Sequence, residues 1–361
     1  MASEDVRNKK SLRVALIASD RTVCEYSMFL QRLLVGLADE SVPVALVCPP
    51  DYNVNSAFTG TAEVIHYPVF DLPLMGHLNV RLLVEGLAKF KPTVLHCLCE
   101  SNASLTAQLA RRLDLPYVLM VNSLQKRRSS LAVSSTHCAR FIAPAKSVAD
   151  NLTGLYPESA DLIEQINIGT FISETGGCFS RPSRPAAIIM AHSSGKVGDF
   201  ENVFGVIRHL LIDGYEFMMA VRGGGRAERQ LWNLLAALGL LPVVTLVSRL
   251  MPWRPVATGA DIIVRPQPNH TFDPLLLEAM SVGTAVAGCK GAVDDLIIED
   301  QTAVVFNPDD ELSIMHALKR LLDRREFACQ IAGSAKEYVR QNYTVSGMIS
   351  ATFEVYRKVH A

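Results

Sequence analysis

Short apolar runs alternate with amphipathic stretches along the whole chain. Residues 12–18, LRVALIA, form the first apolar run, and residues 26–37 follow with apolar side chains at helical spacing. Further runs that read as buried strands occupy residues 42–48, 63–67, 93–99 and 117–121. Helical patterns lie between them near residues 80–90 and 105–113. Apolar strands separated by helices predict a parallel sheet with helices on both faces.

The same pattern restarts after residues 172–185, a segment rich in Gly, Ser and Pro that is typical of a connection between domains. Strands are predicted at 186–191, 217–221, 243–247, 262–265, 285–288 and 303–306. Helices are predicted at 203–212, 227–238, 274–282, 310–323 and 326–341. The α/β pattern therefore predicts two doubly wound, Rossmann-like halves. The default ligand site is the cleft across which the two domains face each other.

Composition narrows the possible functions. The 361 residues include 35 basic and 36 acidic side chains, so the net charge of -1 excludes a strong overall basic field for nucleic acid. Aromatic residues make up 7%, which gives no support for a base-stacking platform. The eight scattered cysteines predict reduced thiols in a cytoplasmic protein, and we expect no metal site. We also expect no secretory signal and no membrane span.

Two segments could carry chemistry. Residues 221–226, VRGGGR, follow a predicted strand, and glycines with two arginines there would favour a phosphate, although a simple tight turn explains them equally. In residues 264–284 a strand ends, a polar loop follows, and a helix begins near Pro274. Glu278 lies about one turn inside that helix among apolar neighbours. Such a carboxylate needs a hydroxyl or cationic partner, for which a sugar or ribose diol is suited, unless it lies on a solvated helix face.

The second half contains most of the residues that identify a family. The segments concerned are 221–225, 238–240, 260–264, 272–287, 290–294 and 302–322, and in the first half 91–96, 115–118 and 140–147. With these segments the chain resembles glycosyltransferase family four, the retaining GT-B glycosyltransferases, as a divergent member. The resemblance spans nearly the whole length.

The resemblance implies a division of labour between the halves. Residues 1–170 would form an acceptor-side domain, joined by a C-terminal helix at 343–361 that crosses back onto it, and residues 171–342 a nucleotide-sugar donor domain. The implied enzyme is a hexosyltransferase of carbohydrate biosynthesis. It would move a sugar from a UDP- or GDP-sugar to an acceptor hydroxyl with retention and without a tightly bound cofactor. The implied partners are the nucleotide sugar and a carbohydrate or lipid-linked acceptor, and no nucleic acid.

The resemblance also assigns roles to residues. His270 takes the family position near the transferred sugar, and Glu278 takes the position that holds the nucleotide ribose. Lys196 lies near the position of the family's diphosphate lysine, although an ordinary exposed loop lysine explains it equally. We expect these three residues to be catalytic. Further contacts to the donor are expected from residues around its diphosphate: His192, Arg222, Gly223, Arg226, Phe272, Asp273 and Leu275. Arg21 stands near a missing glycine pair in the first half and would compensate with its charge.

Several of these positions depart from the family. His270 replaces a glutamate and His192 an arginine, and Pro274 has no N–H to offer a diphosphate, which Asp273 would repel. These departures leave open a catalytically degenerate relative that acts as a binding or scaffolding module. A sugar-nucleotide epimerase-like use of the same two-domain architecture is a third possibility.

Two features of the first half, His96 and a basic run, each have two readings. His96 fits a family position that faces the cleft, or it is a structural histidine at a strand end. Asn122 stands where the family often has histidine. The basic run 125–128 would meet an anionic acceptor or a lipid headgroup in a peripheral membrane contact, or it is a solvated loop. Trp253 and Arg254 are expected to pack at a helix start.

Overall fold

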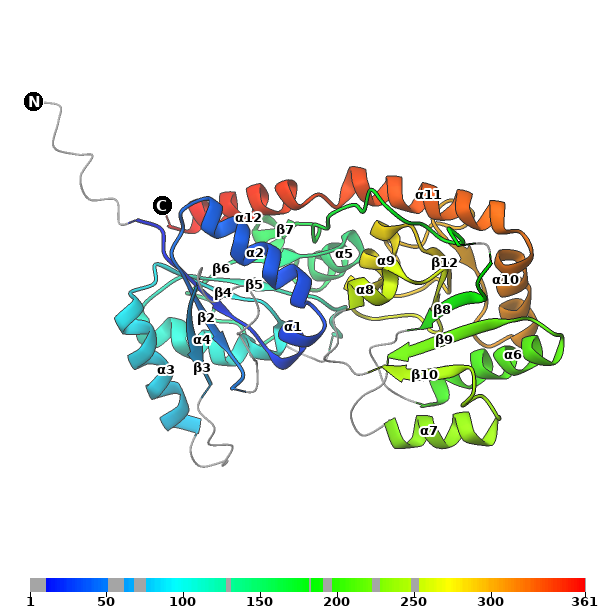
Figure 1. Cartoon of the computed structure of the whole chain (residues 1–361). Helices are drawn as coiled ribbons and strands as arrows, with labels where there is room; N and C mark the ends of the chain where they lie inside the picture. Colours follow the sequence, from blue (N-terminus) through cyan, green and yellow to red (C-terminus); the bar gives the residue numbers. More distant parts are fainter. Residues whose placement is uncertain are drawn as a thin grey trace, which may run out of the picture. The chain divides into compact units, whose positions relative to one another are not determined.

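The computed structural model describes residues 11–50, 62–67, 76–127, 131–181, 183–190, 197–222, 228–247 and 253–360. The chain divides into two compact units (Figure 1). One unit comprises the residues up to Gly169 together with those from Val345 onward, and the other comprises Thr170–Thr344.

The first unit is built on a seven-stranded parallel sheet with the order β3-β2-β1-β4-β5-β6-β7. Its strands are β1 (Val14–Ile17), β2 (Val44–Cys48), β3 (Ala62–His66), β4 (Val94–Cys97), β5 (Tyr117–Met120), β6 (Cys138–Ala143) and β7 (Ile163–Gln165). Every residue of β1, β2, β4 and β5 is buried. Strands buried on both faces explain why these segments read as continuous apolar runs.

The helices of the first unit come from both ends of the chain. They are α1 (Asp20–Cys24), α2 (Ser27–Asp39), α3 (Gly76–Phe90), α4 (Ala103–Leu113), α5 (Lys146–Leu155) and α12 (Val345–His360). Helix α3 packs with α4, and α12 packs with α2 and contacts β4 and β6 (Figure 1). Ile349 and Tyr356 are among the buried residues of α12, so the last helix contributes to the core of the first unit.

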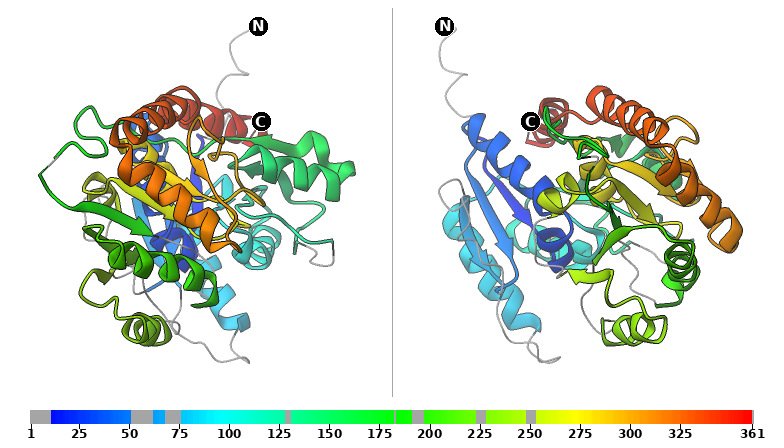
Figure 2. Two further views of the ribbon diagram at one scale, coloured as in Figure 1. Left: turned by 90° about the vertical axis from the view of Figure 1, so that its right-hand side faces the viewer. Right: turned by 45° about the vertical axis from the view of Figure 1, so that its right-hand side comes forward.

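The second unit repeats the same architecture. Its six parallel strands are ordered β10-β9-β8-β11-β12-β13. They are β8 (Ala186–Met190), β9 (Phe217–Arg222), β10 (Val244–Val247), β11 (Ile262–Arg265), β12 (Ala285–Gly288) and β13 (Val304–Val305). The helices are α6 (Glu201–Ile212), α7 (Glu228–Ala237), α8 (Trp253–Thr258), α9 (Pro274–Val282), α10 (Glu311–Asp323) and α11 (Arg325–Asn342). Helix α10 lies beside α6, and α11 lies against α9 and β12 (Figure 2).

The predicted fold of two parallel α/β halves is confirmed, and β11, α9 and β12 have the predicted bounds. The prediction missed α1, β6, α5 and β7. Helix α1 has only five residues and is held by a capping box between Ser19 and Thr22, so it shows little helical periodicity. Strand β6 is only half buried and includes Arg140, which interrupts its apolar run. No helix among the described residues has the length and apolar character needed to cross a membrane.

Each sheet reverses its strand order once, between β1 and β4 in the first unit and between β8 and β11 in the second. In open α/β sheets ligands bind outside the carboxyl ends of the strands at such a point. Arg21 lies in the short helix α1 that follows β1, Asn102 lies in the 3-10 turn that follows β4, and the loop after β11 includes His270 and Asp273. The fold therefore places several predicted site residues at the two switch points.

Candidate active site

Glu278 lies one turn inside α9, and only 5% of its side chain is exposed. Its Oε1 accepts a hydrogen bond from Thr170 Oγ1 at 3.0 Å, and its Oε2 accepts one from Arg254 Nη1 at 2.5 Å. An ionised carboxylate is costly to bury without partners of this kind. The two contacts explain how α9 holds a charged residue within the core of the second unit.

The Arg254 guanidinium joins three segments of the second unit. Besides the Glu278 carboxylate on α9, its Nη1 donates to Ser281 Oγ at 3.1 Å. Its Nη2 donates to the backbone oxygen of Phe171 at 2.6 Å. Arg254 itself lies in α8, so one side chain ties α8, α9 and residues 170–171 together.

These contacts revise the expectation for Glu278. The alternative that Glu278 lies on a solvated helix face is wrong, because the carboxylate is buried. The hydroxyl and cationic partners that the sequence led us to seek in a ligand are supplied by the chain itself, through Thr170 and Arg254. Neither partner was identified from the sequence, where Arg254 was expected only to pack. Contact of Glu278 with a ribose stays a prediction.

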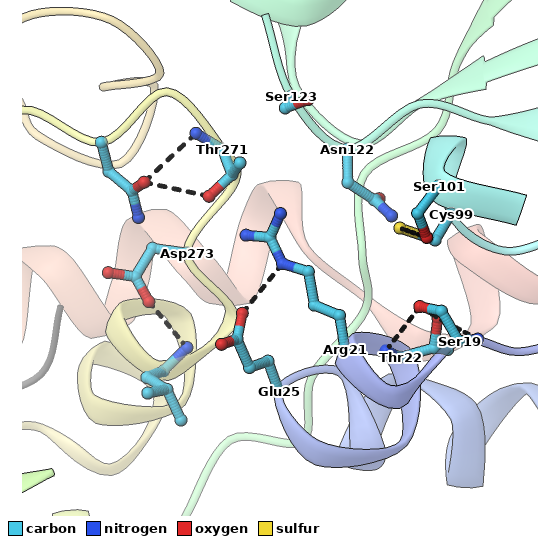
Figure 3. Close-up of polar contacts among 12 residues, drawn as sticks. Ser19, Arg21, Thr22, Glu25, Cys99, Ser101, Asn122, Ser123, Thr271 and Asp273 are labelled. Carbon is cyan, nitrogen blue, oxygen red and sulfur yellow. Dashed lines mark hydrogen bonds and ion pairs between the residues drawn. The ribbon is translucent and has the colours of Figure 1, made fainter. Parts of the chain in front are cut away.

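Asp273 caps the N-terminus of α9. Its Oδ1 accepts hydrogen bonds from Leu275 N at 3.0 Å and from Leu276 N at 3.2 Å. Figure 3 shows the Asp273 carboxylate at the start of α9. Pro274 occupies the first turn, where a missing N–H is harmless. The backbone donors that a diphosphate would use at this terminus are therefore engaged by Asp273, which alters the expectation that Asp273 and Leu275 contact a donor directly.

Phe272 belongs to the core. Its side chain is 1% exposed and stacks on Tyr343 with ring centroids 6.3 Å apart. The ring is thus unavailable to a ligand. A donor contact of Phe272, as predicted from the sequence, would have to be made by its backbone.

His270 is exposed, but hydrogen bonds of neighbouring residues fix the loop that carries it. Asn269 Oδ1 accepts from the N–H and the hydroxyl of Thr271 (Figure 3). Asn269 O accepts from Val293 N at 2.9 Å. The buried Arg265, at the end of β11, donates from Nη2 to Val293 O at 2.9 Å. These bonds tie the loop after β11 to the loop after β12 and support His270 on an ordered backbone.

The remaining predicted donor-binding residues of the second unit follow β8 and β9 in the sequence. Arg222 is the last residue of β9, and its guanidinium lies 5.8 Å from the centroid of the Trp253 ring. His192, Lys196, Gly223 and Arg226 lie outside the described residues. Within the described ranges, no three His, Cys, Asp or Glu side chains are grouped to hold a metal ion.

A cavity of about 520 Å³ lies at the carboxyl ends of β1, β2 and β4 in the first unit. Its lining includes Arg21, Tyr67, Glu100, Ser101 and Asn102. Arg21 donates from Nε to Glu25 Oε2 at 2.9 Å, as Figure 3 shows. The Tyr67 hydroxyl accepts from Asn102 Nδ2 at 2.8 Å. Hydroxyl, amide and charged groups thus converge on one hollow at the switch point of this sheet.

Glu100 and Asn122 meet beside this cavity. The Glu100 carboxylate accepts from the Asn122 backbone N–H at 3.0 Å and from the Ser123 hydroxyl. The buried Asn122 donates from Nδ2 to Leu98 O at 2.9 Å. Asn122 therefore stabilises the ends of β4 and β5.

His96 is a buried side chain of β4, as its structural reading requires. Its Nδ1 lies 2.5 Å from the Tyr356 hydroxyl on α12. Burial lowers the pKa of His96 to about 3, so the imidazole is neutral at physiological pH.

In the basic run, Lys126 and Arg127 are exposed, in agreement with a solvated loop. Gln125 N donates to Asn151 Oδ1 at 2.7 Å and anchors the start of this loop. Arg128 lies outside the described residues.

Comparison with known proteins identifies both units. Residues 27–170 match the profile of Glycosyltransferase Family 4, and residues 202–324 match that of Glycosyl transferases group 1. The sulfoquinovosyl transferase SQD2 of Arabidopsis thaliana is 24% identical over 295 residues, which are 74% of this chain. The chain spans just over half of that relative, 56% of its length.

Solved structures agree in fold. A structure of Anabaena HepE in complex with UDP and glucose is similar with a TM-score of 0.77 at 13% identity, covering 96% of this chain and 100% of that one. A sucrose-phosphate synthase from Thermosynechococcus elongatus gives a TM-score of 0.76 at 15% identity, covering 96% and 98%. Together with the two family profiles, these similarities establish that the chain belongs to the family 4 type of glycosyltransferases with the GT-B fold.

Proposed function

We propose that this glycosyltransferase transfers a hexosyl group, with retention, from a UDP- or GDP-sugar to a hydroxyl of a carbohydrate or lipid-linked acceptor. Anabaena HepE, which has been solved with UDP-glucose, supports a uridine nucleotide as the first donor to test. The cytoplasm as the site of the reaction and a role in carbohydrate biosynthesis are parts of the same proposal.

One observation carries the proposal. A buried carboxylate, Glu278, lies one turn inside the helix that follows the switch-point loop of the second unit. An internal cation and an internal hydroxyl hold it in place. A fixed, charged acceptor of this kind suits a pair of ribose hydroxyls, because hydrogen bonds to charged groups are stronger than those to neutral ones.

The proposed chemistry asks for electrostatic stabilisation more than for acid–base catalysis. As the bond between sugar and diphosphate breaks, negative charge grows on the departing nucleotide, and Lys196, Arg222 and Arg226 are the cations proposed to balance it. His270 would hydrogen-bond the transferred sugar. Because Asp273 occupies the first backbone donors of α9, these side chains carry the whole of the anion binding in this proposal.

For the acceptor we propose the cavity of the first unit. Ser101, Asn102 and Tyr67 offer the hydroxyl and amide groups that pair with sugar hydroxyls. Arg21 adds a positive charge, and Asp20 and Glu100 add two negative ones, so the lining favours a polar, hydroxylated molecule over a strongly anionic one.

The test is calorimetric titration of the purified protein with UDP, GDP and their sugar conjugates, with and without Mg²⁺. We expect binding at micromolar strength that falls at least about tenfold, or about 1.4 kcal/mol, in Glu278→Ala and in Lys196→Ala. Glu337→Ala, which removes an exposed carboxylate from α11, is the matched control and should bind like the unsubstituted chain.

Absence of nucleotide binding to the folded protein would contradict the proposed transfer reaction. That result would favour the binding or scaffolding module instead. Binding that is unchanged in Glu278→Ala would leave a donor site but remove Glu278 from it.

A further inference from the structure

We propose that Arg254 is a positioning residue for donor binding, which acts by holding the Glu278 carboxylate in a single charged orientation. The inference rests on the proposed function, because it assigns Arg254 a role through the carboxylate expected to bind the nucleotide. Arg254 belongs to none of the sequence patterns that indicated the donor site. The fold brings it into contact with Glu278.

The carboxylate is held at both of its oxygens. Thr170 Oγ1 donates to Oε1 at 3.0 Å, while Arg254 Nη1 donates to Oε2 at 2.5 Å. The two donors come from different segments, so rotation of the carboxylate about its last side-chain bond would break at least one of the bonds. Glu278 is therefore fixed before any ligand arrives, which lowers the entropy cost of binding.

Arg254 is in turn fixed by its other contacts. Its Nη2 donates to Phe171 O at 2.6 Å, and its Nη1 also reaches Ser281 Oγ at 3.1 Å. Ser281 Oγ donates to the backbone oxygen of Glu278 at 2.8 Å, which closes a ring of bonds around the carboxylate. A planar guanidinium can serve these separate acceptors at once, whereas a lysine ammonium cannot reproduce that fork.

The charge of Arg254 matters as much as its geometry. Only 5% of the Glu278 side chain is exposed, against 22% of Arg254. A carboxylate with so little access to water is strongly disfavoured in its ionised form when its cation is removed. Loss of Arg254 should therefore weaken the acceptor strength of Glu278 as well as loosen its orientation.

The second unit offers a matched control with a purely structural arginine. Arg184 Nη2 donates to Asp261 Oδ1 at 3.1 Å, and the Asp261 side chain is 2% exposed. Asp261 also accepts hydrogen bonds from Phe179 N at 2.6 Å and from Ala187 N at 2.8 Å. This carboxylate therefore stabilises the backbone around Phe179 and Ala187. Arg184→Met removes a cation from an equally buried carboxylate that has no proposed ligand.

The experiment is a double-mutant cycle between Arg254 and Glu278, with UDP and GDP as probes in calorimetry and unfolding temperature measured in parallel. We expect Arg254→Met to weaken binding of the preferred nucleotide about tenfold in the unsubstituted chain. In the Glu278→Gln background the same change should cost less than about twofold, because Arg254 acts through the carboxylate. Arg254→Lys should restore part of the affinity, and Arg184→Met should lower the unfolding temperature while leaving affinity within about twofold.

Where turnover of a nucleotide sugar is measurable, Arg254→Met should raise the donor KM and leave kcat nearly unchanged, as expected when the lost binding is shared equally by the ground state and the transition state. Equal, additive losses of affinity in both backgrounds, or a loss in Arg184→Met as large as in Arg254→Met, would overturn the inference alone. Failure of the unsubstituted chain to bind either nucleotide would overturn the proposed function and this inference with it.

Discussion

Two buried titratable side chains, one in each unit, illustrate opposite solutions to burial. Glu278 forms an ion pair with Arg254. His96 has the Tyr356 hydroxyl as its neighbour and stays neutral, because burial lowers its pKa to about 3. The first arrangement preserves a strong hydrogen-bond acceptor, whereas the second ties two distant parts of the chain together without a charge.

The neutrality of His96 predicts a pH dependence of stability. In the unfolded chain a histidine titrates near its ordinary pKa of about 6.5, so below that pH the unfolded state binds a proton that the folded state refuses. Stability is therefore complete above about pH 6.5 and is lost as the pH falls toward about 3. In this window His96 contributes a slope of about 1.4 kcal/mol per pH unit to the free energy of unfolding.

Denaturant unfolding of the unsubstituted protein and of His96→Gln between about pH 7 and pH 4 checks this contribution. The unsubstituted protein should lose stability more steeply on acidification, by about the slope given above. His316→Gln, which changes an exposed histidine on α10, should leave the slope unchanged. Parallel curves for His96→Gln and the unsubstituted protein would show that His96 is not held neutral.

At the scale of elements, the start of α9 combines a helix cap with a candidate ligand site. Asp273 satisfies two N–H groups of the first turn with its own carboxylate, and Gly283 ends the helix with a left-handed φ of 86°. A helix N-terminus attracts anions through these same N–H groups. Asp273 therefore stabilises α9 and competes with a diphosphate at one place.

Substitution of Asp273 separates the two effects. Asp273→Asn keeps a capping oxygen and removes the negative charge, so we expect near-unchanged stability and tighter binding of UDP or GDP. Asp273→Ala removes the cap, and we expect a loss of about 0.5–2 kcal/mol in the free energy of unfolding. Nucleotide titrations and denaturant unfolding of both variants provide the check. Weaker binding in Asp273→Asn would instead place the Asp273 carboxylate in contact with the ligand.

The sequence predicted local features of α9 well and its long-range contacts not at all. Pro274 at the first turn and the glycine after Val282 mark the ends of the helix, and the predicted bounds hold. The burial cost of a carboxylate at position 278 also follows from its apolar neighbours. Its partner Thr170, however, is 108 residues away in sequence, and no local pattern indicates that contact. The cap formed by Asp273 was equally legible in principle, since aspartate before proline and an apolar run is a helix-start signal.

On the scale of the whole molecule, α12 completes the first unit with residues from beyond the second. Helix α12 packs against α2, where Gly36 leaves room for Ile349. A Cβ added at Gly36 would lie 2.5 Å from Cδ1 of Ile349, well inside contact distance. The close approach of these helices therefore depends on a residue without a side chain.

This packing predicts that Gly36→Ala destabilises the first unit by about 1–3 kcal/mol, because overpacking outweighs the gain in helix propensity. Gly333→Ala on α11 is the matched control: a Cβ there meets nothing within 4 Å, so the same change should stabilise by about 0.5–1 kcal/mol. Thermal unfolding should show a lower unfolding temperature for Gly36→Ala and a higher one for Gly333→Ala. The double variant Gly36→Ala with Ile349→Val should recover part of the stability lost in Gly36→Ala. A stabilising Gly36→Ala would mean that Ile349 moves aside without cost.

The first unit is built from two separate segments of the chain, which affects the order in which the protein folds on the ribosome. Domains usually fold in the order of their synthesis. Here the first unit lacks α12 until residues 345–360 have been translated, and the contact between His96 and Tyr356 closes over 260 residues. The second unit is one continuous stretch whose residues are all made earlier. The unit that is synthesised first is thus completed last. Its sheet lacks α12 until the entire second unit has left the exit tunnel.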